Sequence, residues 1–208
     1  MRHFNLYNRN IYKRFPPGHG FWREKLARAR FKIIMKYVQV KEGDKVLEVG
    51  CDEDIMLKMF EHKGAVGYGI EIDKTVVKLA NHARIELGNA EELSFTKDFF
   101  DLIIASHVIE HLKNSQEFLR EAIRVTKKNG KIVLIYPLEF FPGMTIIPEL
   151  LLSGQSIYKM RDIHKHCFTP AKIKELTKNL PVIHEQSKLF LGFPCLALQY
   201  FTLLKVQK

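Results

Sequence analysis

Residues 45 to 50 read Lys-Val-Leu-Glu-Val-Gly, a short apolar strand that runs directly into a glycine turn, and this stretch decides the fold. A second apolar run, residues 65 to 72, contains Glu71, which lies 21 positions after Gly50. In a nucleoside-binding βαβ unit, a glycine at the end of the first strand lets the backbone approach the ligand. A carboxylate at the tip of the second strand accepts hydrogen bonds from both ribose hydroxyls. The spacing therefore predicts a ligand that carries a ribose.

The glycine-rich fingerprint of dinucleotide sites is interrupted after Gly50, where the chain reads Cys51-Asp52-Glu53-Asp54. A dinucleotide places its pyrophosphate on the helix that follows this turn, so acids there would repel it. S-Adenosylmethionine carries no phosphate and presents a sulfonium and an ammonium group near the same turn. The acids therefore favour a methyl donor over NAD or FAD.

Strand and helix patterns alternate along the rest of the chain, which predicts a mostly parallel sheet covered on both faces. Apolar runs predict strands at 46–49, 65–72, 84–87, 101–105, 131–136, 182–187 and 197–206, and helical spacing predicts helices at 21–38, 53–62, 74–83, 115–127 and 170–178. With 208 residues, 46% of them hydrophobic, the chain fits one α/β domain.

Cysteine usage indicates the compartment. Cys51, Cys167 and Cys195 are too few and too scattered for a disulfide framework, which suits a reducing environment. The first residues lack the apolar core of a secretory signal. The longest charge-free stretch, 189–204, contains Gly192 and Pro194 and is 16 residues long. That is shorter than the roughly 20 residues that span a bilayer. We expect a cytoplasmic protein without a transmembrane segment.

The net charge of +10 is concentrated at the front of the chain. Residues 1–41 hold eleven Lys or Arg and a single acid, whereas the remaining residues carry equal numbers of basic and acidic side chains. The front also holds Tyr7, Tyr12, Phe15 and Trp22. Such a segment predicts contact with RNA or an anionic surface, and a solvated helix face is the alternative.

Residues 138–168 break the alternation of strands and helices. They are apolar, include Phe-Phe-Pro-Gly-Met at 140–144, and follow the strand 131–136 at the sheet edge where open α/β sheets bind ligands. Long loops in compact domains are usually functional, so this segment predicts a substrate lid, with a packed loop as the alternative. The expected organisation is a basic N-terminal arm and helix over 1–41 and a single domain over 42–208.

Four segments, read in order, carry a resemblance. They are Val-Leu-Glu-Val-Gly-Cys at 46–51, Gly-Ile-Glu-Ile-Asp at 69–73, Gly-Asn-Ala-Glu-Glu-Leu-Ser-Phe at 88–95, and Phe-Asp-Leu-Ile-Ile-Ala-Ser-His-Val-Ile-Glu-His-Leu at 100–112. In these segments the chain resembles the class I S-adenosylmethionine-dependent methyltransferases, especially the broad group with small-molecule substrates. The resemblance implies a seven-stranded, mostly parallel, Rossmann-like sheet with helices on both faces and an antiparallel last strand.

The resemblance also implies roles for single residues. Glu71 would hold the ribose, and Asn89 stands where the family has an aspartate that meets the adenine amino group, a bond that an amide oxygen still accepts. Ser106 and His107 would face the transferred methyl group, with His107 as the catalytic base. The expected cofactor-binding set is Glu48, Gly50, Cys51, Asp52, Glu71, Ile72, Asn89, Ala90 and Ser106. Asp52 and Asp54 depart from the family, because they occupy the positions of its second and third glycines.

Two histidine clusters in the sequence are candidate metal sites. His107-Val-Ile-Glu110-His111 matches the H-x-x-E-H pattern of a zinc hydrolase family, but its first histidine directly follows a buried strand instead of sharing a helix face with the second. The run His-Lys-His-Cys at 164–167 has no partner cluster in the sequence. We expect no metal, with His111 packing at a helix start and residues 164–167 forming a hinge or substrate-facing loop.

The sequence thus predicts methyl transfer from S-adenosylmethionine to an unidentified small-molecule or lipid-like acceptor, with RNA as a second acceptor class. The alternative is a degenerate, non-catalytic binding module. In that case Asp52 and Asp54 would have abolished cofactor binding.

Overall fold

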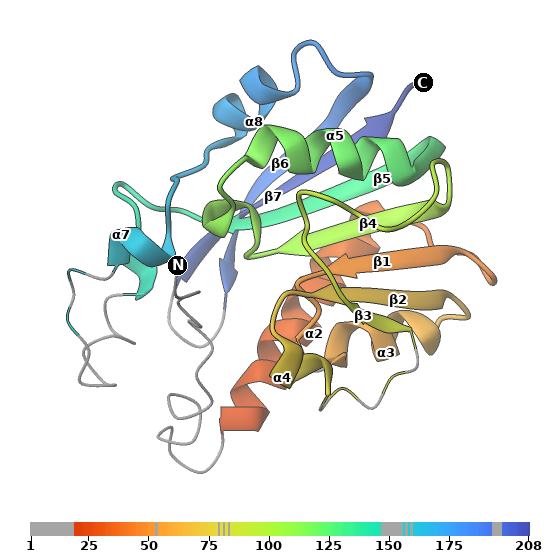
Figure 1. Ribbon diagram of the computed structural model, residues 1–208, viewed down its shortest axis with the longest axis horizontal. Helices are drawn as coiled ribbons and strands as arrows, with labels where there is room; N and C mark the ends of the chain where they lie inside the picture. Colours follow the sequence, from red (N-terminus) through yellow and green to blue (C-terminus); the bar gives the residue numbers. More distant parts are fainter. Residues whose placement is uncertain are drawn as a thin grey trace.

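The computed structural model describes residues 19–52, 54–78, 80, 82, 84–146, 156, 158, 160–192 and 197–208. These residues build a seven-stranded sheet in the order β3-β2-β1-β4-β5-β7-β6 (Figure 1). In chain order the strands are β1 (Lys45–Val49), β2 (Val66–Glu71), β3 (Ile85–Leu87), β4 (Phe100–Ser106), β5 (Thr126–Pro137), β6 (Val182–Gly192) and β7 (Ala197–Val206). Each predicted strand is present, with shifts at the ends.

Strand direction confirms the predicted fold class. β1 pairs in parallel with both β2 and β4, β2 with β3, and β4 with β5. β7 is reversed, because it pairs antiparallel with β5 and with β6. The carboxyl ends of the parallel strands therefore meet at one edge of the sheet. The strand order reverses between β1 and β4, which is where open α/β sheets bind ligands.

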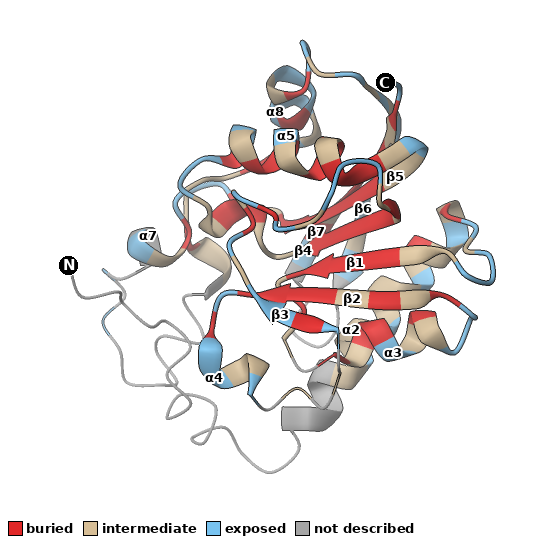
Figure 2. Ribbon diagram, turned by 45° about the vertical axis from the view of Figure 1, so that its right-hand side comes forward, coloured by how far each residue is buried: buried red, intermediate tan, exposed pale blue. Residues whose placement is uncertain are grey.

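Helices cover both faces of the sheet. α2 (His19–Tyr37) and α3 (Ile55–Glu61) pack on one face, and α5 (Ser115–Val125) and α8 (Pro170–Leu176) on the other (Figure 1). The connections hold the short helices α4 (Lys74–Val77) and α7 (Met160–Ile163) and the 3-10 turns η1 (Ile109–His111) and η2 (Met144–Ile146). Figure 2 shows the buried residues gathered in the central strands and on the sides of helices that face them.

α5 shows why a helix forms where the sequence predicts one. The side chain of Asn114 accepts a hydrogen bond from the Glu117 N–H at 3.1 Å, which satisfies one of the free N–H groups of the first turn. Phe118 and Leu119 are fully buried against the sheet. Burial of each such side chain stabilises the fold by about 1.5–3 kcal/mol. The helix ends when the chain becomes extended at Thr126.

β5 begins earlier than the sequence predicts. Thr126 already pairs with Phe100, but the regular ladder resumes only where Lys131 pairs with Leu102. The residues between them bulge, and Asn129, with φ of 62°, takes the left-handed conformation that asparagine tolerates. The Asn-Gly pair at 129–130 therefore forms a bulge within the strand instead of a turn before it.

The helix of the basic front segment packs against the sheet and contributes to the hydrophobic core. Ile34 on α2 and Val38 just after it are buried in one cluster with Ile104 and Phe201. Residues 1–18, which hold much of the predicted basic arm, lie outside the described residues. None of the described helices combines the length and the apolarity that a membrane crossing requires.

The predicted lid is described mainly at its two ends, residues 138–146 and 160–168, while its middle, residues 147–155, lies outside the described residues. Phe140 is 83% exposed and Phe141 is also exposed. Glu139 and His164, by contrast, are buried at the base of the segment. The segment therefore presents aromatic side chains outward and anchors polar ones inward.

Candidate active site

The turn after β1 keeps the backbone path of a glycine-rich loop although aspartates occupy it. Gly50, Asp52 and Asp54 have φ angles of 68°, 49° and 64°, all in the left-handed region. A Cβ on Gly50 would lie 2.7 Å from Val108 Cγ2, so the turn and the loop after β4 are in close contact. The turn therefore holds two aspartates in a conformation that L side chains disfavour.

Glu71 ties the tips of β1 and β2 together. Its Oε1 accepts hydrogen bonds from the N–H groups of Ile72 at 2.8 Å and Asp73 at 3.1 Å, and its Oε2 accepts a longer one from Asp52 at 3.3 Å. The Glu71 carbonyl accepts from the Gly88 N–H at 2.9 Å, which brings the loop after β3 to the same place. The carboxylate thus lies where the sequence predicts it, at the junction of three predicted cofactor segments.

Three buried carboxylates gather around this turn, namely Glu48, Asp54 and Glu71. Burial raises the pKa of Glu48 to about 8; the nearby Arg30 opposes this shift, and Asp54 and Glu71 add to it. Burial also raises the pKa of Glu71, against the hydrogen bonds that it accepts. Asp54 Oδ1 forms an ion pair with Lys58 at 2.7 Å. The interior of the turn therefore gathers carboxyl groups, and a cation bound beside Glu48 would favour its ionised form.

The acidic interior fits a cationic ligand that can form hydrogen bonds. Glu48 Oε2 and Ser106 Oγ are buried without a hydrogen-bond partner among the described residues. A buried polar atom of this kind costs free energy unless a ligand or water satisfies it. S-Adenosylmethionine brings a positive sulfonium and an ammonium donor, so the residues present fit this cofactor, whereas a pyrophosphate would be repelled.

Cys51 acts as a packing residue in this turn. Its side chain is 4% exposed, and burial together with the neighbouring acids raises the pKa of its thiol. A Cβ at Gly69 would lie 2.5 Å from Cys51 Sγ, so the thiol fills the space that the glycine leaves. The thiol is therefore protonated and held beside β2, and the Cys51 N–H donates to the Ile70 carbonyl at 3.3 Å.

The predicted adenine side of the site lies at the ends of β2 and β3. Ile72 is a large apolar residue with 70% of its side-chain surface exposed, immediately after Glu71. Asn89 is exposed, and its side-chain oxygen accepts a hydrogen bond from the Glu91 N–H at 3.0 Å, while Ala90 is buried beneath it. An apolar face and a polar edge therefore stand side by side at this end.

The end of β4 carries the predicted base. His107 has φ of 56°, and its N–H donates to the Ile135 carbonyl at 2.8 Å. Its Nδ1 lies 3.1 Å from Oε1 of Glu110, an ion-pair distance, and its Nε2 is buried without a partner among the described residues. Burial would raise the pKa of Glu110, but His107, His111 and His164 together outweigh burial and hold that pKa at about 2. An ionised carboxylate therefore orients the imidazole.

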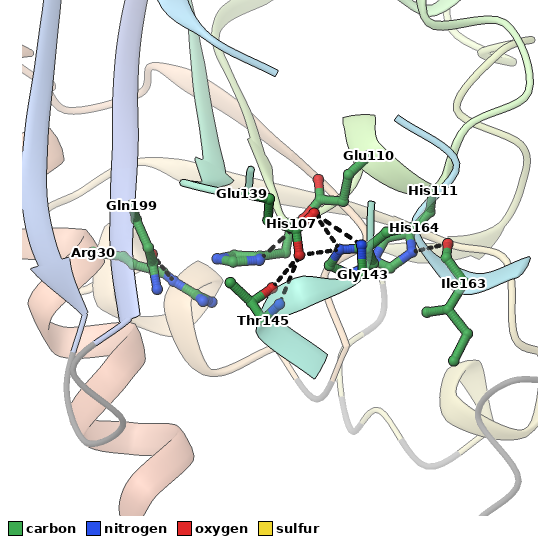
Figure 3. Close-up of polar contacts among 10 residues, drawn as sticks. All are labelled: Arg30, His107, Glu110, His111, Glu139, Gly143, Thr145, Ile163, His164 and Gln199. Carbon is green, nitrogen blue, oxygen red and sulfur yellow. Dashed lines mark hydrogen bonds and ion pairs between the residues drawn. The ribbon is translucent and has the colours of Figure 1, made fainter. Parts of the chain in front are cut away.

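A second polar group lies beside this pair (Figure 3). His164 Nδ1 is 2.9 Å from Glu139 Oε1, and the same carboxylate accepts hydrogen bonds from the Thr145 N–H and hydroxyl at 2.9 and 2.6 Å. His111 Nδ1 is 2.9 Å from the Ile163 carbonyl. These contacts join both ends of the segment 138–168 to the turn after β4.

Sequence reasoning missed several residues of this edge. Arg30, one of the basic residues of the front segment, is partly buried and donates a hydrogen bond to Gln199 Oε1 at 3.3 Å. Burial lowers its pKa to about 10, against the attraction of Glu110 and Glu48. Of the residues missed, only Glu110 could have been found from the sequence, through the H-x-x-E-H pattern. Arg30 and Glu139 carried no such signal, because tertiary packing alone brings them to the edge.

Comparison with known proteins agrees with this geometry. A family model described as a methyltransferase domain matches residues 18–180. Demethylmenaquinone methyltransferase of Halalkalibacterium halodurans is 27% identical over 137 residues, which cover 60% of this chain and 56% of that protein. The chain therefore spans a little over half the length of this curated relative.

Solved structures extend the similarity in fold to nearly the whole chain. A chain from the complex that contains the Trm112 methyltransferase activator of Haloferax volcanii has a TM-score of 0.73 at 13% identity, covering 96% of this chain and 98% of that one. The PH0226 protein of Pyrococcus horikoshii OT3 has a TM-score of 0.68 at 19% identity, covering 94% and 98% of the two chains.

Proposed function

The chain belongs to the family of methyltransferase domains, and we propose that it transfers a methyl group from S-adenosylmethionine to a small-molecule or lipid-like acceptor. One observation carries the proposal. Buried Glu48, Asp54 and Glu71 surround a turn with glycine-like backbone at the carboxyl edge of the sheet. Such a site attracts a cation and repels a phosphate. A nucleoside with a sulfonium and no phosphate matches both properties.

Each part of the cofactor has a matching group in the chain. Glu71 would accept hydrogen bonds from the ribose hydroxyls, and Glu48 would face the ammonium group. Ile72, which is 70% exposed, offers an apolar surface for the adenine ring. Asn89 and the backbone of Ala90 would meet the polar edge of the ring. The backbone of residues 50–52, held by left-handed φ angles, would line the methionine chain.

Methyl transfer requires little of the protein beyond positioning the acceptor against the methyl group. The cofactor supplies an already activated methyl group, so alignment of the acceptor contributes most of the acceleration. A protonated acceptor also needs a base, and His107 fits this role. Because Glu110 faces Nδ1 of His107, the proton of the neutral imidazole stays on Nδ1. The buried Nε2 of His107 can therefore take a proton from an acceptor hydroxyl.

The surroundings support an apolar acceptor. Phe140 and Phe141 are exposed just beyond the end of β5, on the segment 138–168 that the sequence predicts as a lid. An aromatic lid suits a ring compound or a lipid tail better than a strongly polar acceptor. The relative from Halalkalibacterium halodurans is named for demethylmenaquinone, which is a compound of this kind.

A methyl-transfer assay tests the proposal. The full chain is incubated with methyl-labelled S-adenosylmethionine and a short-chain demethylmenaquinone that has been chemically reduced to the quinol, and we expect label in the methylated quinol. His107→Asn keeps a residue that tolerates left-handed φ and should lower kcat by roughly 10²–10⁴-fold without weakening cofactor binding. The control His62→Asn, at an exposed position after α3, should leave the rate unchanged.

Two outcomes would contradict this account. Binding of S-adenosylmethionine without transfer to any phenolic or quinol acceptor would favour the non-catalytic module. A full rate in His107→Asn would remove this histidine from the proton transfer.

A further inference from the structure

Two histidine motifs that are far apart in the sequence meet at the end of β4. Glu110 and His111 lie on η1, and His164 follows α7, more than fifty residues later. One potential ligand atom from each of the three residues lies within 4.8 Å of the other two (Figure 3). The rings of His111 and His164 stand edge to face, with their centroids 4.7 Å apart. The fold thus brings the two motifs together, and residues 107–111 provide the partner cluster that residues 164–167 lack in the sequence.

The partners of the two imidazoles fix which nitrogen carries the proton. His164 Nδ1 faces the Glu139 carboxylate at 2.9 Å, and His111 Nδ1 faces the Ile163 carbonyl at 2.9 Å. Both partners are acceptors, so both Nδ1 atoms donate. In the neutral rings, Nε2 then keeps its lone pair, and the structure gives it no hydrogen bond in the described part of the chain. Metal-binding histidines typically donate their other N–H to a carboxylate or a backbone carbonyl in this way.

Glu110 supplies an independent indication of a ligand. Its side chain is 1% exposed, and its Oε2 has no hydrogen-bond partner among the described residues. A carboxyl group buried with an oxygen that lacks a hydrogen bond is costly unless a ligand compensates it. His107 approaches Oε1 at ion-pair distance, which leaves Oε2 for another partner. Among the described residues, Arg30 is a fixed cation that lies close enough to attract Glu110.

We propose that Glu110, His111 and His164 bind a divalent transition-metal ion such as Zn²⁺, with Glu139 and the Ile163 carbonyl as the outer partners of the two imidazoles. Two imidazole nitrogens and one carboxylate suit Zn²⁺ and similar ions, whereas Mg²⁺ prefers oxygen ligands. Zn–ligand bonds of about 2.0–2.1 Å place tetrahedral donors about 3.4 Å apart, a spacing that side-chain rotation reaches from the present one. Three protein ligands are typical of open sites, which keep a position for water or substrate.

An ion here would fasten the segment 138–168 to the sheet. Glu139 lies near the start of that segment and His164 near its end, while Glu110 and His111 belong to the turn after β4. The backbone already makes one such link, because the Lys165 N–H donates to the Glu110 carbonyl at 2.8 Å. The ion would strengthen this link. The proposal is independent of the methyl-transfer function, because it rests on donor geometry alone.

Metal binding by the full chain is tested with Zn²⁺ as the probe. After EDTA treatment and removal of the chelator, titration calorimetry and elemental analysis should give one Zn²⁺ per chain, with much weaker binding of Mg²⁺. His111→Ala and His164→Ala should each weaken Zn²⁺ binding at least 100-fold. Glu139→Gln keeps the ligands and the shape and should weaken it roughly 10–100-fold, the usual effect of losing an outer partner. His166→Ala, which alters a neighbouring histidine outside the cluster, should bind as the parent does.

Hydrogen exchange provides a second readout that needs no variant. Zn²⁺ should slow amide exchange in residues 139–146 and 160–168 of the parent and leave α5 unchanged. Three results would overturn the proposal: no stoichiometric Zn²⁺ in the folded parent, equal affinity in His164→Ala and Glu139→Gln, or binding without protection of these two stretches. Preferential binding of Mg²⁺ would overturn the assignment of the ion.

Discussion

Glu48 shows, at the scale of a single residue, how burial sets the state of a side chain in this site. Its pKa is raised to about 8 by burial, whereas the unfolded chain would ionise it near its ordinary value of 4.5. Between these two values the folded protein binds more protons than the unfolded one. The contribution of Glu48 to stability is therefore fully present below pH 4.5 and is lost as the pH rises through about 8.

Comparison of the parent with Glu48→Gln isolates this effect. From pH 5 to 8 the free energy of unfolding of the parent should fall relative to that of the variant, by up to about 1.4 kcal/mol per pH unit. Urea denaturation at several pH values gives both curves. Parallel curves over this range would show that Glu48 titrates normally in the folded protein.

Asp52 and Asp54 hold left-handed φ angles of 49° and 64° that glycine adopts without strain. Because the backbone already follows left-handed φ angles that suit glycine, and Lys58 compensates the Asp54 charge at 2.7 Å, changing both residues to glycine should alter the affinity for S-adenosylmethionine no more than about threefold. Parent and double variant are titrated side by side. A folded parent that does not bind, together with a double variant that binds clearly, would mean that the aspartates had inactivated the site.

The residues that the sequence predicted are those with a local signature. Glu71 and His107 each end a strand that an apolar run marks, so their position at the edge followed from the pattern. Arg30, Glu139 and His164 come from a helix, a loop and the far end of a long connection. No local pattern relates them, because only the packing of α2 and of the segment 138–168 brings them to the same edge.

Close packing between β2 and the turn after β1 is the feature to test at the scale of elements. A Cβ at Gly69 would lie 2.5 Å from Cys51 Sγ and 2.8 Å from Ile85 Cγ1. Gly69→Ala should therefore destabilise the protein by about 1–3 kcal/mol through overpacking. In Gly67→Ala, the nearest atoms are those of the flexible Glu61 side chain at 3.2 Å, so the loss should be smaller. Urea denaturation compares the two, and equal losses would contradict the packing described.

Element boundaries mark the limit of sequence reasoning at this scale. The strands of the sheet were predicted because buried parallel strands read as continuous apolar runs. The start of β5 was misplaced, because the Asn-Gly pair at 129–130 favours a turn and a bulge about equally. The predicted helix at 74–83 is too long, because α4 ends at Val77 and the described residues 78, 80 and 82 lie outside a helix.

At the scale of the whole molecule, the strand order brings functional side chains from distant segments of the sequence to one edge of the sheet. β1 and β4 are neighbours although more than fifty residues separate them, so the acidic turn at 50–54 and the histidine loop at 107–111 touch. This arrangement follows from the parallel topology, which the alternation of strands and helices predicted. The carboxyl groups at this edge are the basis of the proposal that a cationic nucleoside binds here in preference to a dinucleotide.

Calorimetric titration with S-adenosylmethionine tests the central claim most directly. The parent should bind one molecule per chain and should not bind NAD. Glu71→Ala should weaken binding by about 1.5–3 kcal/mol, or roughly 10- to 150-fold, because the buried carboxylate proposed to hold the ribose is lost. Glu175→Ala, which removes an exposed acid on α8, should bind like the parent. Unchanged affinity in a folded Glu71→Ala variant, or no binding by the folded parent, would contradict the account.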